Sequence, residues 1–151
     1  MRYAYLFILA VLIGACAPVS TTEPAPTAVP PYRITADENP YAPMPEDLGF
    51  RQAGVIITSA SLSERLELTP IRANLNLLGS MPSSCNQLRA NIEPPNESFQ
   101  IFVEVYSVVD PNLKCETVFQ QFSGDILLGV YTPGRYTIWV NDELVGDMLS
   151  Y

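Results

Sequence analysis

Apolar and polar side chains alternate along several short segments of this chain, and this period of two constrains its fold more than any other feature. Ile71, Ala73 and Leu75 alternate with Arg72 and Asn74. Because successive side chains of a β-strand point to opposite faces, such a segment forms a strand with one face in the core and one in solvent. The same alternation is present in residues 65–69, 88–93 and 99–106.

Further strand segments complete the pattern of a β-protein. Strands are also expected at residues 55–62, 117–122, 126–130, 136–140 and 143–145. No window of ten or more residues has the amphipathic pattern of a helix. About seven to nine short strands separated by turn residues are typical of an antiparallel β-sandwich with Greek-key connections. We therefore predict an all-β fold of this architecture.

Three turn segments carry specific predictions about the backbone. Thr132-Pro133-Gly134-Arg135 suits a type II turn, because proline fixes φ and glycine accepts a positive φ. Asn141-Asp142 is expected to join the last two strands in a tight hairpin, since asparagine tolerates a positive φ. Gly124 leaves two alternatives open: it turns a hairpin at Ser123-Gly124-Asp125, or it marks a bulge within one long strand from Glu116 to Leu128.

The last third of the chain resembles a known kind of domain. Residues 128–141 read L-G-x-x-x-P-G-x-Y-x-x-x-V-N. This motif is similar to the ending of uncharacterised immunoglobulin-like domains in bacterial lipoproteins, which implies an immunoglobulin-like β-sandwich and no particular activity. Gly134-x-Tyr136 is also similar to a tyrosine corner, in which the phenol bonds to upstream backbone, so Tyr136 is expected to be structural.

The first sixteen residues have the parts of an export signal. Arg2 supplies a positive charge, an apolar run follows from Tyr3 to Ile13, and Gly14-Ala15 are the small residues that precede a cleavage site. Ile13-Gly14-Ala15-Cys16 resembles the lipobox of bacterial lipoproteins. The resemblance implies cleavage before Cys16 and attachment of acyl chains, such as palmitate, at this cysteine. An ordinary secretory signal is the alternative, and the run is shorter than the about 20 residues of a membrane-spanning helix.

A proline-rich segment separates this leader from the strand segments. Residues 17–49 contain eight of the prolines, among small, polar and acidic residues. This composition is typical of an extended, disordered linker. We therefore expect a signal peptide at 1–15, a lipid-anchored cysteine and linker at 16–49, and a β-sandwich domain at 50–151. The anchor would hold the protein at the cell membrane or the outer membrane, facing the extracytoplasmic side.

The cysteine count agrees with an exported, lipidated chain. The sequence has three cysteines, and lipidation of Cys16 leaves Cys85 and Cys115 as an even pair. Exported proteins meet oxidising conditions, in which such a pair forms a structural disulfide. We therefore predict a Cys85–Cys115 disulfide.

Composition excludes several classes of function. The chain has no histidine, which excludes His-dependent nucleophile systems and His-assisted zinc sites. Its 16 acidic and 8 basic residues give a net charge of −8, which argues against binding of nucleic acid. The oxygen-bearing residues Asn141, Asp142, Glu143 and Asp147 lack the spacing of a calcium loop, and no carboxylate pair stands out for glycoside hydrolysis. We expect no catalytic residue, no metal and no cofactor, and we interpret the protein as not an enzyme.

Aromatic residues form the candidate interaction surface. Phe102, Tyr106 and Trp139, together with Tyr131 and Phe119, include positions that alternate with the most apolar strand residues. Exposed aromatic patches mark interaction sites. We favour the other interpretation, that these rings fill the core between the two packed sheets.

These features favour a membrane-tethered, non-enzymatic module that binds a protein or a glycan outside the cytoplasm. A structural lipoprotein of envelope assembly is the alternative. An exported hydrolase that uses two carboxylates is the third possibility.

Overall fold

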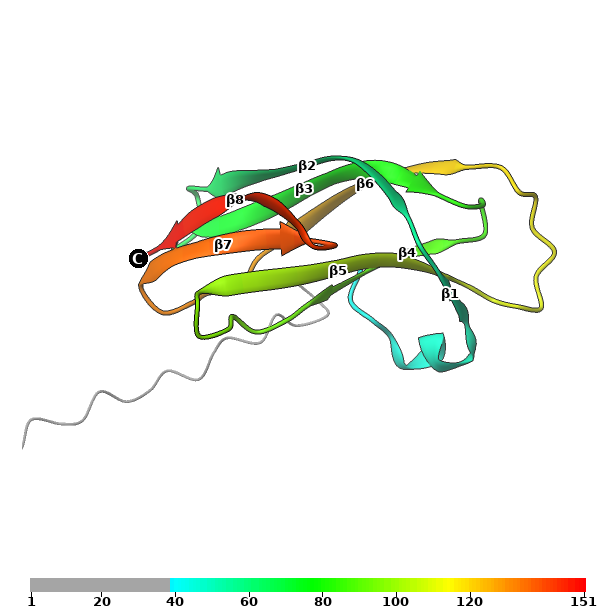
Figure 1. Cartoon of the computed structure of the whole chain (residues 1–151), viewed down its shortest axis with the longest axis horizontal. Coiled ribbons are helices and arrows are strands. Elements are labelled where there is room, and N and C mark those ends of the chain that lie inside the picture. The colour runs from blue at the N-terminus through cyan, green and yellow to red at the C-terminus, as the bar shows by residue number, and fades with distance from the viewer. Residues whose placement is uncertain (1–38) are drawn as a thin grey trace, which may run out of the picture.

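The computed structural model describes residues 39–151, which form a sandwich of two β-sheets (Figure 1). The larger sheet contains β1 (Arg51–Ala53), β4 (Gln87–Ile92), β5 (Gln100–Val109), β7 (Gly134–Val140) and β8 (Glu143–Ser150). The smaller sheet contains β2 (Ile56–Arg65), β3 (Arg72–Met81) and β6 (Gln120–Leu127). One 3-10 helix, η1 (Pro45–Gly49), precedes β1, and no helix in the described region is long and apolar enough to cross a membrane. The predicted all-β sandwich is confirmed.

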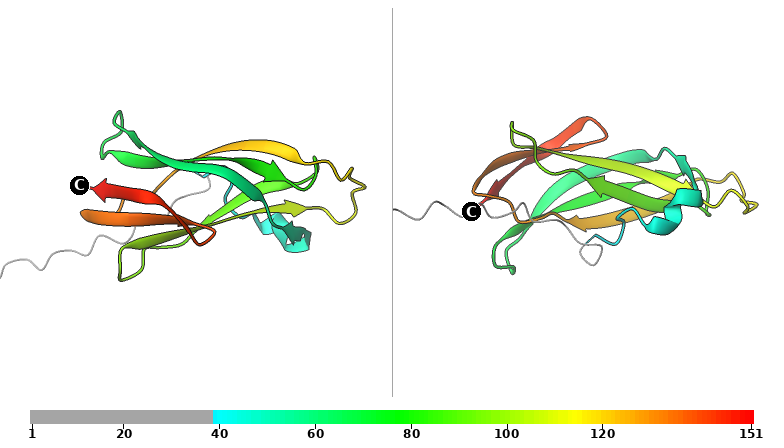
Figure 2. Two further views of the ribbon diagram at one scale, coloured as in Figure 1. Left: turned by 45° about the horizontal axis from the view of Figure 1, so that its top comes forward. Right: turned by 90° about the horizontal axis from the view of Figure 1, so that it is seen from below.

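Strand β5 organises the larger sheet. It pairs with β4 along one side, and on the other side it pairs with β7 near its start and with β1 near its end. The β5–β7 pair is parallel, whereas all other strand pairs of the described region are antiparallel. The chain changes sheet after β1, β3, β5 and β6, so segments distant in sequence face each other across the two layers that Figure 2 shows.

The core lies between the two layers and follows the predicted alternation. Leu75 and Leu77 of β3, Ile101 and Val103 of β5, and Ile138 of β7 are at most 1% exposed. Burial of each such side chain contributes roughly 1.5–3 kcal/mol. The alternating faces predicted for residues 72–77, 88–92 and 100–106 therefore correspond to inward and outward faces of β3, β4 and β5. Ile71 and Phe99, which were also predicted to face inward, lie just outside the strands and are 38% and 48% exposed.

Two predictions near β2, β3 and β6 are wrong. Residues 66–71 are not a strand; they turn the chain between β2 and β3, whose pairing ends at Arg65↔Arg72, and Leu66 is exposed. Pro70 lacks the N–H that a ladder needs, which disfavours a strand there. Neither alternative for Gly124 holds in full. Gly124 pairs with Leu77 inside one strand, which excludes the hairpin, and that strand covers only Gln120–Leu127 in a register without a bulge.

The two turn predictions in the C-terminal third have opposite outcomes. The type II turn at residues 132–135 is wrong, because no glycine of the described region has a positive φ and Gly134 already begins β7. The hairpin at Asn141-Asp142 is confirmed. These residues have φ values of 46° and 68°, and Val140 pairs with Glu143 across the turn.

The packed region begins before the expected boundary at Phe50. Asn39 is 4% exposed, and its Nδ2 donates to the Ala90 carbonyl at 2.9 Å. The Ala90 N–H donates in turn to the Tyr41 carbonyl at 2.7 Å, and the Tyr41 hydroxyl donates to the Ser123 carbonyl at 3.3 Å. Residues 39–41 therefore cover the edge of β4 and connect it to β6, which protects an edge strand from pairing with other chains.

Candidate functional site

The outer face of the larger sheet carries the three aromatic residues of the predicted interaction surface. Phe102 and Tyr106 lie on β5, at positions that alternate with the buried Ile101, Val103 and Val105. Trp139 lies beside Phe102 in the parallel β5–β7 register, with ring centroids 6.1 Å apart and planes inclined by 29°. All three side chains are half-buried and face away from the core.

The alternative that aromatic residues fill the core holds for only part of the set. Tyr131 is 8% exposed and packs in the core cluster, whereas Phe102, Tyr106 and Trp139 lie on the outer face. Phe119 lies in the loop before β6 and is 65% exposed, outside the outer face of the larger sheet. The structure thus brings Phe102, Tyr106 and Trp139 together on one surface.

A hollow of about 520 Å³ lies beside these rings, where the larger sheet is incomplete. β7 ends at Val140 and β1 pairs only with the end of β5, so no strand flanks the middle of β5 on this side. The walls of the hollow carry mainly polar and aromatic side chains, those of Gln52, Glu93, Phe102, Glu104, Tyr106, Asn141 and Asp142. We call this site the outer-face hollow.

Asn141 closes the gap in the sheet. Its Oδ1 accepts from the Val105 N–H at 2.7 Å, and its Nδ2 donates to the Val105 carbonyl at 2.9 Å. The Asn141 N–H donates to the Val103 carbonyl at 3.1 Å. The amide side chain therefore takes the place of a neighbouring strand and satisfies backbone groups that would otherwise lack partners.

The outer-face hollow is acidic. Glu93, Glu104 and Asp142 line it, and none of its lining residues is lysine or arginine. Gln52 donates weakly to the Glu104 carboxylate, with a separation of 3.5 Å between Nε2 and Oε1. Three carboxylates at the rim of one concave surface give it a negative potential, which attracts positive groups.

Helix η1 covers the outer face next to the hollow. Arg89 on β4 is 4% exposed and makes a bidentate ion pair with Asp47 of η1, with Nε–Oδ2 2.7 Å and Nη2–Oδ1 2.8 Å. The Arg89 hydrogen bonds hold the pKa of Asp47 below its ordinary value, and the same contact raises the pKa of Arg89. Tyr106 lies near this pair; burial is the main cause of its raised pKa, and the negative charges of Asp47 and Glu104 add to it.

We expect Asp47→Asn to destabilise the protein by about 2 kcal/mol at neutral pH, because the buried Arg89 loses its charged partner. The lowered pKa of Asp47 means that the carboxylate stabilises the fold above its ordinary pKa of 3.8, and that this stabilisation is lost as pH falls through the lower, folded value. Urea unfolding at pH 7 and pH 2 should therefore show that the difference between wild type and variant shrinks in acid. A difference that is independent of pH would contradict this role of Asp47.

Tyr136 forms the predicted tyrosine corner. It is 2% exposed, and its hydroxyl donates to the Thr132 carbonyl at 2.9 Å, four residues upstream. Its ring packs against Phe99 and Tyr131, with both centroid distances 5.3 Å. Burial raises the pKa of Tyr131 to about 12, so the Tyr131 hydroxyl is uncharged at neutral pH. The cluster fixes the start of β7 and hence the strand that carries Trp139.

We expect Tyr136→Phe to lower the free energy of unfolding by about 1 kcal/mol, because the ring stays in place while the Thr132 carbonyl loses its donor. Tyr131→Phe is the matched control, since it removes only a longer contact of 3.3 Å from the Gly129 N–H. Urea midpoints of the two variants measure this difference. An equal effect of both substitutions would show that the corner hydrogen bond is not the cause.

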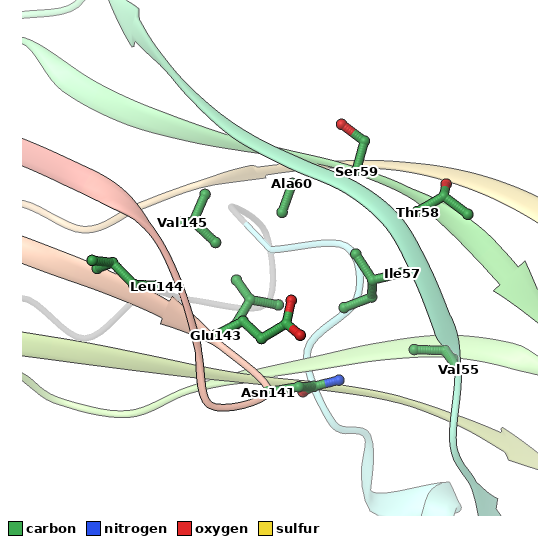
Figure 3. Close-up of a pocket in the computed structure, with 10 residues that line it drawn as sticks. Val55, Ile57, Thr58, Ser59, Ala60, Asn141, Glu143, Leu144 and Val145 are labelled. Carbon is green, nitrogen blue, oxygen red and sulfur yellow. The ribbon is translucent and has the colours of Figure 1, made fainter.

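A second hollow, of about 350 Å³, lies at the open edge between β2 and the β7–β8 hairpin (Figure 3). Its lining combines apolar side chains, such as Ile57 of β2 and Val145 of β8, with polar groups that include Thr58 and Ser59. Glu143 alone among its lining residues has an ionisable side chain. This hollow therefore contains no pair of acid–base groups.

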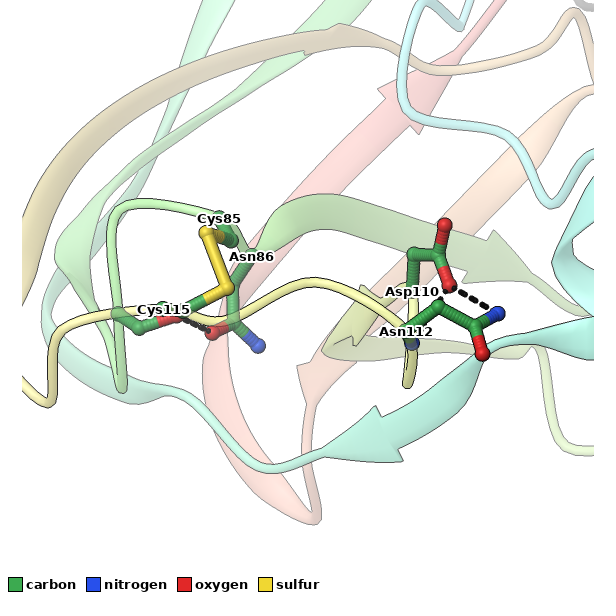
Figure 4. The surroundings of a disulfide bond; sticks show 6 residues. Cys85, Asn86, Asp110, Asn112 and Cys115 are labelled. Carbon is green, nitrogen blue, oxygen red and sulfur yellow. Dashed lines mark hydrogen bonds between the residues drawn. A yellow bond between two sulfur atoms is a disulfide. The ribbon is translucent and has the colours of Figure 1, made fainter.

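The disulfide lies at the end of the sandwich where the β3–β4 and β5–β6 loops meet (Figure 4). Cys85 and Cys115 are bonded, with a Cα–Cα distance of 5.9 Å, which confirms the predicted pair. Next to it, Asn86 donates to the Ser107 hydroxyl at 2.9 Å and accepts from the Ser83 hydroxyl. Ser107, which is fully buried, donates to the Ala53 carbonyl at 3.1 Å, so buried polar groups here are paired.

Other candidate residues of the sequence are not brought together. Asn141 is engaged by Val105, and Asp147 forms an exposed ion pair with Arg135, at 2.9 Å. Across residues 39–151, no group of three or more histidine, cysteine or acidic side chains is arranged to hold a metal ion. The predicted lipidation site, Cys16, lies outside the described residues.

The fold and its disulfide define the described region as a β-sandwich domain. Residues 75–148 match the family model of the ORF11 beta-sandwich domain. The matched segment starts within β3, ends within β8 and includes both bonded cysteines, Phe102, Tyr106 and Trp139. No curated protein and no solved structure matches this chain. The family match thus supports the fold and names no ligand.

Proposed function

We propose that this protein is a lipid-anchored, non-enzymatic module of the cell envelope, which binds a protein or glycan ligand on the outer face of its larger sheet. One observation carries the proposal: Phe102 and Trp139 stack on that face beside the outer-face hollow, although the core is filled without them. Rigid aromatic side chains held next to a concave surface are the typical centre of a binding interface.

The proposal of a lipid anchor is based on the leader sequence. Ile13-Gly14-Ala15-Cys16 resembles a lipobox, and the motif at residues 128–141 is similar to immunoglobulin-like domains of bacterial lipoproteins. Tyr136 supports the immunoglobulin-like assignment, because its hydroxyl makes the contact of a tyrosine corner.

Cys16→Ser should move the protein from the detergent phase to the aqueous phase on partitioning. Unchanged partitioning would contradict a lipid anchor.

Site-specific photo-crosslinking in the native envelope tests the binding face. A photoreactive amino acid at Phe102 should give a discrete adduct. The same label at Leu78 is the matched control, since Leu78 is likewise an apolar residue on the outer face of a strand but belongs to the smaller sheet. Adducts that form equally at both positions, or only at position 78, would refute the assignment. Absence of adducts at both, with an envelope defect on deletion, would favour a structural role in envelope assembly.

A further inference from the structure

We infer that the outer-face hollow receives lysine or arginine side chains of a partner polypeptide. This inference rests on the proposed binding function and adds the chemistry of the ligand. The hollow is concave, lies in a gap of the larger sheet, and has the size of pockets that hold ligands, which are typically about 300–1,000 Å³.

The aromatic rings of the hollow offer a binding surface for a cation. Phe102 and Tyr106 line the hollow, and Trp139 stacks against Phe102. The face of an aromatic ring attracts an ammonium or guanidinium group within about 6 Å of its centre. The long alkyl stem of lysine or arginine can also cover the apolar ring surface while the charged end stays in the hollow.

The acidic side chains of the hollow also favour a cationic ligand. Glu93, Glu104 and Asp142 come from three separate segments, the end of β4, the middle of β5 and the β7–β8 turn, and they converge on one hollow without a lining basic residue. The nearby basic residues are engaged elsewhere: Arg89 is buried against Asp47, and Arg135 pairs with Asp147. The complementary potential of the hollow would speed the association of a cationic ligand.

Other classes of ligand fit less well. Nucleic acid and anionic glycans are negatively charged, so the carboxylates of the hollow would repel them. A neutral glycan can stack on Phe102 and Trp139, but its hydroxyl groups do not require three carboxylates. A polypeptide with basic side chains uses both the rings and the charges, so charge complementarity selects it.

The single tryptophan of the chain makes the inference directly measurable. Trp139 is the only tryptophan in the sequence, and its ring lies beside the hollow. We would titrate the full chain in detergent with an octalysine peptide and follow tryptophan emission. The emission should change as octalysine is added and should reach a plateau when the site is saturated. The affinity for octalysine should fall as the salt concentration rises, and octa-acetyl-lysine should leave the emission unchanged.

Charge variants separate the inference from the proposed function. Glu104→Gln combined with Asp142→Asn keeps the shape of the hollow and should weaken octalysine binding about tenfold, the size expected for two exposed ion pairs. Glu116→Gln, on the exposed β5–β6 loop, is the control and should bind as wild type. Equal binding by all three chains, or equal binding of acetylated peptide, would overturn the inference.

The same titration is repeated with a neutral glucose hexasaccharide as the third probe. If it alone changes Trp139 emission, the cationic ligand is refuted while the proposed binding face stands. If no probe changes the emission and position 102 gives no crosslinks, both proposals fail.

Discussion

Replacement of Cys85 and Cys115 by serine is expected to lower the free energy of unfolding by roughly 3.5–4 kcal/mol. The two cysteines are 30 residues apart, and the chain-entropy model assigns this amount to closing a loop of that length. The loss is a large fraction of the stability of a domain of this size, which is of order 5–15 kcal/mol. The substituted domain should therefore unfold at a much lower urea concentration.

The measurement compares two chains that both carry Cys16→Ser, so that neither an acyl chain nor a third thiol interferes. The urea midpoint and slope of each chain give the free energy of unfolding. A difference below about 1 kcal/mol would contradict the prediction, since the disulfide typically contributes 2–4 kcal/mol. That result would mean that the Asn86–Ser107–Ala53 hydrogen bonds, which join the β3–β4 loop to β5 and β1, hold this end of the sandwich without the covalent bond.

The predictable part of the fold is the part that depends on local periodicity. Alternation in residues 72–77 and 100–106 identified the inward faces of β3 and β5, because successive side chains of a strand point to opposite faces. The hairpin at Asn141-Asp142 was predictable for the same reason, since its backbone depends on the residues of the turn itself. The segment 65–69 shows the limit of prediction from alternation, because five alternating residues also fit an exposed turn.

The unpredicted features depend on contacts between distant segments. β1 is only three residues long and is a strand because it pairs with the end of β5. Residues 39–49 have the composition of a linker, yet Asn39 bonds to β4 and Asp47 pairs with Arg89, 42 residues away. No local pattern in the proline-rich segment indicates either contact.

The part of the candidate site that lies on β5 was predictable from the sequence, and the rest was not. Alternation places Phe102, Glu104 and Tyr106 on one face of β5, so their common side follows from sequence. Trp139 joins them only through the parallel β5–β7 register, and Gln52 and Asp142 reach the same hollow through the gap between β1 and β7. Such a gap is visible only when the order of the strands is known.

Asn141→Ala is expected to destabilise the protein by about 3 kcal/mol, because Asn141 performs two structural tasks. Its side chain makes both hydrogen bonds to Val105, which contribute about 1 kcal/mol each. Its backbone has a φ of 46°, a left-handed conformation that costs alanine roughly 1–2 kcal/mol. The substitution also removes one wall of the outer-face hollow, so the emission of Trp139 should respond less to octalysine.

Asn141→Gly separates the two tasks, because glycine adopts a positive φ without strain but makes no side-chain hydrogen bond. Urea unfolding should place this variant about 1 kcal/mol above Asn141→Ala and about 2 kcal/mol below wild type. Hydrogen exchange at the Val105 amide should become faster in both variants, since its acceptor is lost and the hollow admits water. If Asn141→Gly were as stable as wild type, the amide would not bridge the gap between β7 and β1, and backbone conformation alone would explain the asparagine.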